Sequence, residues 1–130
     1  MIKTVLLVED DPSWQFNYEE ILSDEGFKVM VAGSKEDAMK KFNDSVFDLA
    51  VIDLRLVDTD PKNNDGIEVI KELRQVFPEM PIIVKSGYLD PEIKNRLEEL
   101  KIYDDNILDK LDEHGQKQKL VSILQRIFKD

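Results

Sequence analysis

The sequence has 130 residues, which suits one compact domain, and its 42% hydrophobic content excludes a disordered or fibrous chain. The absence of cysteine excludes a disulfide framework and a thiolate metal site. The formal net charge of -10 argues against direct binding of nucleic acid, because phosphate backbones need clustered lysine and arginine, and it favours cations and partners with basic patches. Without a signal peptide or an apolar run of transmembrane length, we expect residues 1–130 to form one soluble, cytoplasmic domain with no membrane partner.

Strands and helices are predicted to alternate along the whole chain. Apolar runs predict strands at 4–8, 27–32, 47–53, 81–85 and 106–108, and helical spacing predicts helices after each strand, beginning near residues 12, 35, 67, 91 and 116. Such an alternation predicts a single-domain α/β fold, in which a doubly wound, five-stranded parallel sheet carries helices on both faces.

Local signals predict where the first helix begins and ends and where the second helix begins. Asp11 is expected to cap the first helix, with Pro12 in its first turn, and Gly26 is expected to end it. Ser34 and Asp37 resemble a capping box at the start of the second helix.

Polar residues follow the carboxyl ends of four of the five predicted strands. They are Glu9 and Asp10, then Asp53, Ser86 and Lys110. Ligands of open α/β sheets bind at the carboxyl ends of the strands, so these side chains are candidates for one site. Taken singly, each has a simpler interpretation: a solvated acid at Asp53, a turn residue at Ser86 and a solvated loop lysine at Lys110.

Carboxylates gathered at one edge need a proton or a cation between them. Two unit charges about 4 Å apart interact by about 4 kcal/mol at an effective dielectric constant of about 20. Oxygen ligands with open positions favour Mg²⁺, and an aspartate beside Mg²⁺ can attack phosphorus to form an aspartyl phosphate. Histidine-rich zinc chemistry is excluded because the single histidine, His114, lies in a polar segment and is expected at the surface.

Four motifs, in order and spaced by helices, resemble the receiver domain of two-component response regulators. They are residues 6–12 (LLVEDDP), 48–56 (DLAVIDLRL), 65–66 (DG) and 81–88 (PIIVKSGY). The resemblance runs from end to end and implies the flavodoxin-like strand order 2-1-3-4-5, which makes the first and third strands neighbours.

The same resemblance implies a role for each candidate residue. Asp53 would be the phosphoacceptor, Ser86 the switch hydroxyl and Lys110 the lysine facing them; Glu9 and Asp10 would be the acidic pair, with Mg²⁺ bound by Asp10, Asp53 and the backbone carbonyl of Arg55. Phosphate would come from a histidine kinase or a histidine phosphotransfer protein. The domain would promote its own phosphoryl transfer, without being an enzyme in the wider sense, and would signal to a downstream protein partner.

Three positions depart from the family's usual pattern. The loop from Leu56 to Gly66 is longer and would lie over the site, and Leu111 replaces a proline, which removes the usual cis X-Pro bond. Ile107 stands where an aromatic residue usually swings inward on activation. We therefore predict that Tyr88 is the aromatic residue that reports the phosphorylation state.

Two other functions remain open from the sequence. A receiver-like interaction module that is not phosphorylated is suggested by the unusual segment 103–111. A phosphohydrolase with an aspartyl-phosphate intermediate is disfavoured because Arg55 stands where such enzymes commonly carry a second acid, two residues after Asp53. Nucleotide binding is disfavoured further, since no glycine-rich loop follows the first strand.

Overall fold

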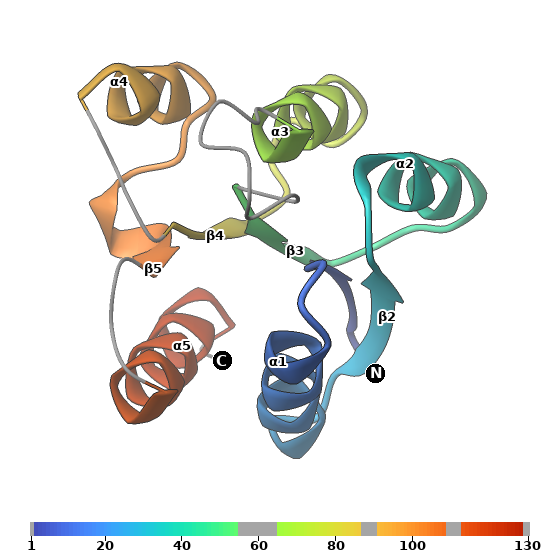
Figure 1. Cartoon of the computed structure of the whole chain (residues 1–130), viewed down its shortest axis with the longest axis vertical. Helices are drawn as coiled ribbons and strands as arrows, with labels where there is room; N and C mark the ends of the chain where they lie inside the picture. Colours follow the sequence, from blue (N-terminus) through green and yellow to red (C-terminus); the bar gives the residue numbers. More distant parts are fainter. Residues whose placement is uncertain (1, 55–64, 87–90, 109–112, 129–130) are drawn as a thin grey trace.

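The computed structural model describes residues 2–54, 65–86, 91–108 and 113–128, the last range without the side chains of residues 113 and 114. Its centre is a five-stranded parallel sheet in the order β2-β1-β3-β4-β5, seen edge-on in Figure 1. The strands are β1 (Thr4–Val8), β2 (Lys28–Ala32), β3 (Leu49–Asp53), β4 (Ile82–Lys85) and β5 (Ile107–Leu108). The helices are α1 (Pro12–Asp24), α2 (Lys35–Asp44), α3 (Asp65–Val76), α4 (Pro91–Glu99) and α5 (Glu113–Ile127). The predicted fold class and strand order are confirmed.

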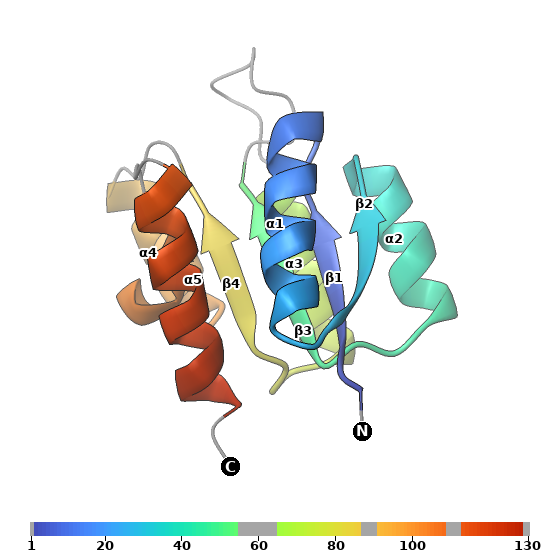
Figure 2. The same cartoon turned by 90° about the horizontal axis from the view of Figure 1, so that it is seen from below.

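The sheet is buried on both faces, with α1 and α5 on one side and α2, α3 and α4 on the other (Figures 1 and 2). Successive side chains of a strand point to opposite faces, so each strand contributes to both cores. In β1, Val5 and Leu7 pack on the α1/α5 side, whereas Leu6 and Val8 pack on the α2/α3/α4 side. This explains why the strands are uninterrupted apolar runs and not alternating ones.

The predicted boundaries of the first two helices are confirmed. The Asp11 side chain accepts hydrogen bonds from two backbone N–H groups of the first turn of α1, and Gly26, with φ 93°, follows its C-terminus. The Ser34 hydroxyl accepts from the Asp37 N–H at 3.1 Å. The returning bond of this capping arrangement comes from the N–H of Gly33, which donates to the Asp37 carboxylate at 3.4 Å.

Several elements differ in extent from their predictions: β3 begins at Leu49, two residues after its predicted start, α3 begins at Asp65, two residues before its predicted start, and the last strand and the last helix differ too. β5 has two residues, because Asp104–Asn106 form a 3₁₀ turn and the Asn106 amide group, not its backbone, donates to the Ile82 carbonyl at 3.3 Å. α5 begins at Glu113, three residues before the predicted start. The prediction was late because the first turns of α5 are polar, so apolar periodicity does not mark them. Within the described ranges, no helix combines the length and apolar character needed to cross a bilayer.

Candidate functional site

Three neighbouring strands end in a charged row on the α1/α5 face of the sheet. Residues of odd number point to this face in β1, β3 and β4, as Leu7, Val51 and Ile83 do. Asp53 is paired in register with Lys85, and Glu9 follows the Val8–Ile52 pair, so Glu9, Asp53 and Lys85 continue the same row. The chain therefore puts charge where the preceding residues of each strand put hydrocarbon.

Backbone hydrogen bonds continue past the strand ends and fix the position of this row. The N–H of Glu9 donates to the Ala32 carbonyl at 3.0 Å, and the N–H of Leu54 donates to the Lys85 carbonyl at 3.1 Å. The Ser86 N–H donates to the carbonyl of Leu108 at 2.9 Å. Ser86 is consequently buried at the same edge, one residue beyond Lys85.

Glu9, Asp10 and Asp53, which we call the acidic triad, lie close enough to share one cation. One ligand oxygen from each lies within 4.8 Å of the other two. Glu9 is 1% exposed and Asp53 is 7% exposed, so water screens little of their repulsion. Because oxygen ligands on opposite sides of a Mg²⁺ ion are about 4 Å apart, this donor set fits Mg²⁺ with small adjustments.

Lys85, for which the sequence predicts no role, lies against the triad in the structure. Its ammonium group donates to Glu9 Oε1 at 2.9 Å and lies 4.0 Å from the ring centroid of Trp14 and 5.8 Å from that of Tyr18. The available signal was the odd-numbered position of Lys85 at the end of β4, which shares the face of Asp53. In the sequence it looks like the final residue of an apolar strand.

Burial changes the acid–base chemistry of Glu9. Desolvation, together with a hydrogen bond to Asp53 and the charge of Asp53, raises the pKa of Glu9 from 4.5 to about 7, although Lys85 acts in the opposite direction. The Glu9 carboxyl group can therefore hold a proton near neutral pH. The negative charge of the triad can be neutralised by that proton, by Lys85 or by a metal ion.

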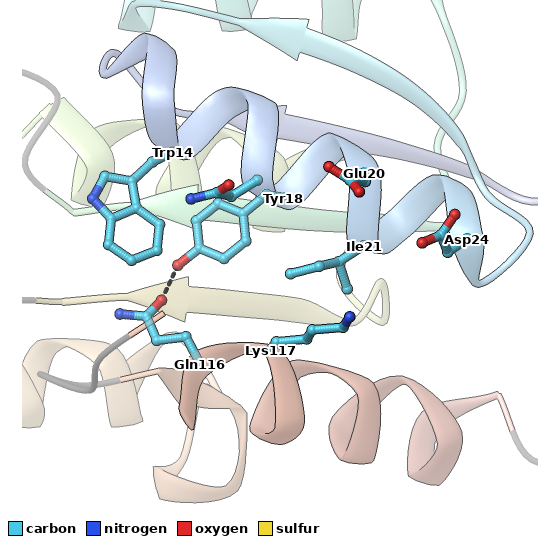
Figure 3. Close-up of a pocket in the computed structure, with 8 residues that line it drawn as sticks. Trp14, Tyr18, Glu20, Ile21, Asp24, Gln116 and Lys117 are labelled. Atoms are coloured by element: carbon cyan, nitrogen blue, oxygen red, sulfur yellow. Dashed lines mark hydrogen bonds between the residues drawn. The ribbon is translucent and has the colours of Figure 1, made fainter. Parts of the chain in front are cut away.

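The aromatic groups around Lys85 connect the triad to the seam between α1 and α5. The Trp14 and Tyr18 rings stack with centroids 5.5 Å apart, and the Tyr18 hydroxyl donates to the side-chain carbonyl of the buried Gln116 (Figure 3). Burial is also the main reason that the pKa of Tyr18 is raised. These three residues line a groove of about 310 Å³ between α1 and α5.

Gly66 packs against the backbone that leaves β3. A Cβ atom at this position would lie 2.5 Å from the Asp53 carbonyl oxygen and 2.6 Å from the Leu54 Cα. No side chain fits there without moving the segment that carries Asp53. The Asp65-Gly66 motif thus has a steric role in bringing α3 up to the site.

The remaining predicted residues have mixed outcomes. Ile107, which stands where the family usually has an aromatic residue, is buried in β5 and is part of the hydrophobic core. Arg55, Tyr88, Lys110 and Leu111, and the loop positions from 55 to 64, lie outside the described residues. His114 lies in α5, but its side chain is outside the described part, so its exposure stays a prediction.

Comparison with known proteins decides the family. The family described as the response regulator receiver domain matches residues 5–123. The chain belongs to this family. Receiver domains are the regulatory modules of two-component response regulators, and the acidic triad lies at the edge of the sheet where the resemblance placed it.

The receiver domain is similar to segments of longer regulators. It is 31% identical over 84 residues to the transcriptional regulatory protein ZraR of Klebsiella oxytoca, covering 65% of this chain and 18% of that protein. It is 41% identical over 80 residues to the transcriptional regulatory protein CpxR of Klebsiella pneumoniae, covering 62% of this chain and 32% of that protein. The chain thus spans about a fifth to a third of the length of these two relatives.

Solved structures share the fold of this receiver domain. The chemotaxis protein CheY4 of Vibrio cholerae superposes with a TM-score of 0.80 at 24% identity, covering 98% of this chain and all of that one. A CheY-like receiver domain protein from Methanospirillum hungatei superposes with a TM-score of 0.78 at 24% identity, over 97% of this chain and 96% of that one. At this level of identity, the likeness concerns the fold.

Proposed function

We propose that residues 1–130 work as one phosphoacceptor unit, in which Asp53 takes a phosphoryl group in a reaction that depends on Mg²⁺. The observation that carries this proposal is the acidic triad: three carboxylates from the ends of two adjacent strands, with ligand oxygens within 4.8 Å of one another. Buried like charges so close need a counter-charge. A purely structural edge of the sheet would gain stability from apolar or neutral groups at these positions.

The residues divide the work of transfer among them. A carboxylate oxygen of Asp53 forms a bond to phosphorus while the P–N bond of the donor's phosphohistidine breaks, and the histidine nitrogen keeps the bonding electrons and takes up a proton. Glu9, Asp10 and Asp53 would hold Mg²⁺, with the carbonyl of Arg55 as a further ligand implied by the family. When bound, Mg²⁺ neutralises charge on the phosphoryl oxygens.

Ser86 and Lys110 are proposed to read the product. Ser86 is 4% exposed, and its backbone N–H is bonded to the Leu108 carbonyl at the same end of the sheet as Asp53, which ends β3. Its hydroxyl is the proposed donor to the new phosphoryl group. Lys110 follows β5 by two residues and would supply a positive charge. Phosphorylation adds a negative charge and strong acceptor oxygens, which these donors can bind.

The phosphodonor proposed for this domain is a histidine kinase or a histidine phosphotransfer protein, and the output is a downstream protein partner. Two similar proteins are named as transcriptional regulators, but the chain matches only a fraction of their length. The net charge of -10 favours a protein with a basic surface as the direct partner of this domain over nucleic acid.

Intact-protein mass spectrometry after incubation with Mg²⁺ and acetyl phosphate tests the proposal. We expect one phosphoryl group on the wild-type chain and none on Asp53→Asn or in the presence of EDTA. Asp48→Asn is the matched control, because Asp48 is exposed at the opposite end of β3, where it accepts from the Thr4 N–H at 2.8 Å. An adduct that persists in Asp53→Asn would refute the assignment, and no adduct at all would favour the unphosphorylated interaction module.

A further inference from the structure

We infer that Lys85 is an internal counter-cation that competes with the divalent metal for the acidic triad. This inference rests on the proposed metal site and adds a residue that sets its affinity. The Lys85 ammonium donates to Glu9 Oε1 at 2.9 Å, and Lys85 is also the register neighbour of Asp53. It therefore places a full positive charge on a carboxylate that faces the proposed metal.

The aromatic pair holds the ammonium group in this position. Lys85 Nζ lies 4.0 Å from the Trp14 centroid and 5.8 Å from the Tyr18 centroid, both within the range of a cation–π interaction, and the two rings stack on each other. The side chain of Lys85 is 14% exposed, so the attraction is only weakly screened by water. Few other positions of this ammonium group would keep its contacts with both a carboxylate and two aromatic rings.

A positive charge in this place acts against a second cation. The ionised Glu9 carboxylate can pair fully with only one cation, either Lys85 or a metal ion. The two cations would also repel each other at a separation of a few ångströms. Lys85 would thus lower the affinity for Mg²⁺ while keeping the buried acids neutralised. The consequence is a receiver whose metal site fills only at higher Mg²⁺ concentrations.

Removing the charge while keeping the stem tests the inference. The test is a calorimetric titration with Mg²⁺ alone of the wild type, Lys85→Met and Lys85→Arg. We expect the Kd of Lys85→Met to fall at least tenfold and that of Lys85→Arg to stay within about threefold of the wild type, since arginine keeps the charge. Lys41→Met is the matched control, because Lys41 forms an ion pair of the same 2.9 Å length with Asp37 on α2.

Trp14 supplies a second readout that does not depend on phosphorylation. Because the ammonium lies over its ring, we expect Mg²⁺ to change Trp14 emission in the wild type by moving Lys85, and to change it much less in Lys85→Met. If Lys85→Met does not fold, Lys85→Gln replaces it in both measurements.

The outcomes separate this inference from the proposed function. Equal or weaker Mg²⁺ affinity in Lys85→Met, with Asp53 still phosphorylated, would overturn the role of Lys85 and leave the phosphoacceptor proposal intact. Tighter binding in Lys85→Met without phosphorylation of Asp53 would support the competition and refute the phosphoacceptor. No binding of Mg²⁺ by any variant would overturn both.

Discussion

Replacing Glu9 by glutamine should remove most of the pH dependence of folding stability between pH 5 and pH 8. The pKa of Glu9 is raised from 4.5 to about 7, first by burial and then by its hydrogen bond and charge interaction with Asp53. The folded chain thus binds this proton more tightly than the unfolded chain. The resulting stabilisation is complete below pH 4.5 and is lost as the pH rises through about 7.

The size of the effect follows from the two pKa values. The difference of about 2.5 between the two pKa values corresponds to about 3.5 kcal/mol of free energy of unfolding at about 1.4 kcal/mol per pKa unit, and about 2.5 kcal/mol of it falls between pH 5 and pH 8. Glutamine resembles the protonated form, so the variant keeps its stability over this range. Relative to the wild type, Glu9→Gln should therefore gain about 2.5 kcal/mol from pH 5 to pH 8.

Urea unfolding followed by circular dichroism, with EDTA present and at four pH values from 5 to 8, measures this difference. Glu19→Gln is the control, because Glu19 is an exposed residue of the same helix that carries Trp14, and its stability curve should run parallel to that of the wild type. If Glu9→Gln also runs parallel to the wild type, Glu9 does not hold its proton more tightly in the folded chain and the electrostatic account of the triad is refuted.

Two further predictions concern the backbone, and thermal or urea unfolding measures both. Gly66→Ala should destabilise the fold by about 2 to 3 kcal/mol, because its Cβ would lie 2.7 Å or less from three backbone atoms, two of them in Leu54. Gly33→Ala should be nearly neutral, because its Cβ would have one neighbour, at 3.5 Å. Lys101→Gly should stabilise by about 1 kcal/mol, since Lys101 has φ 64° at the end of α4, and Gly26→Ala, at φ 93° in the same motif after α1, should destabilise by a similar amount. Equal effects at Gly66 and Gly33, or a loss of stability in Lys101→Gly, would contradict these assignments.

The fold was predictable because its signals are local. Apolar runs, the Asp11 cap and Gly26 after α1 each act within a few residues, and the structure confirms them. The short β5 and the early start of α5 were less predictable. Asn106 replaces a backbone pairing with its side chain, and the first turns of α5 carry no apolar stripe, so neither boundary has a periodic pattern.

The candidate site was predictable in part, because strand ends converge in any parallel sheet. Glu9 and Asp53 met as expected once β1 and β3 were neighbours. Lys85 was missed because it looks like the last residue of an apolar strand, and its contact with Glu9 joins residues 76 positions apart. The contact of Tyr18 with Gln116 joins residues 98 positions apart and depends on how α1 and α5 pack, for which the sequence has no local signal.

The charged row also explains why one face of the sheet carries both stability and chemistry. Glu9 and Asp53 lie at the ends of β1 and β3 on the same face as Val5, Leu7 and Val51, so these acids are buried as the core residues are. Burial makes two adjacent carboxylates unstable as a pair of anions, and every means of relief (a proton, a lysine or a metal ion) adds positive charge at the same place. The free energy that destabilises the doubly ionised site is therefore the same quantity that would favour the binding of a cation there. A substitution that relaxes this repulsion should stabilise the fold and weaken cation binding together.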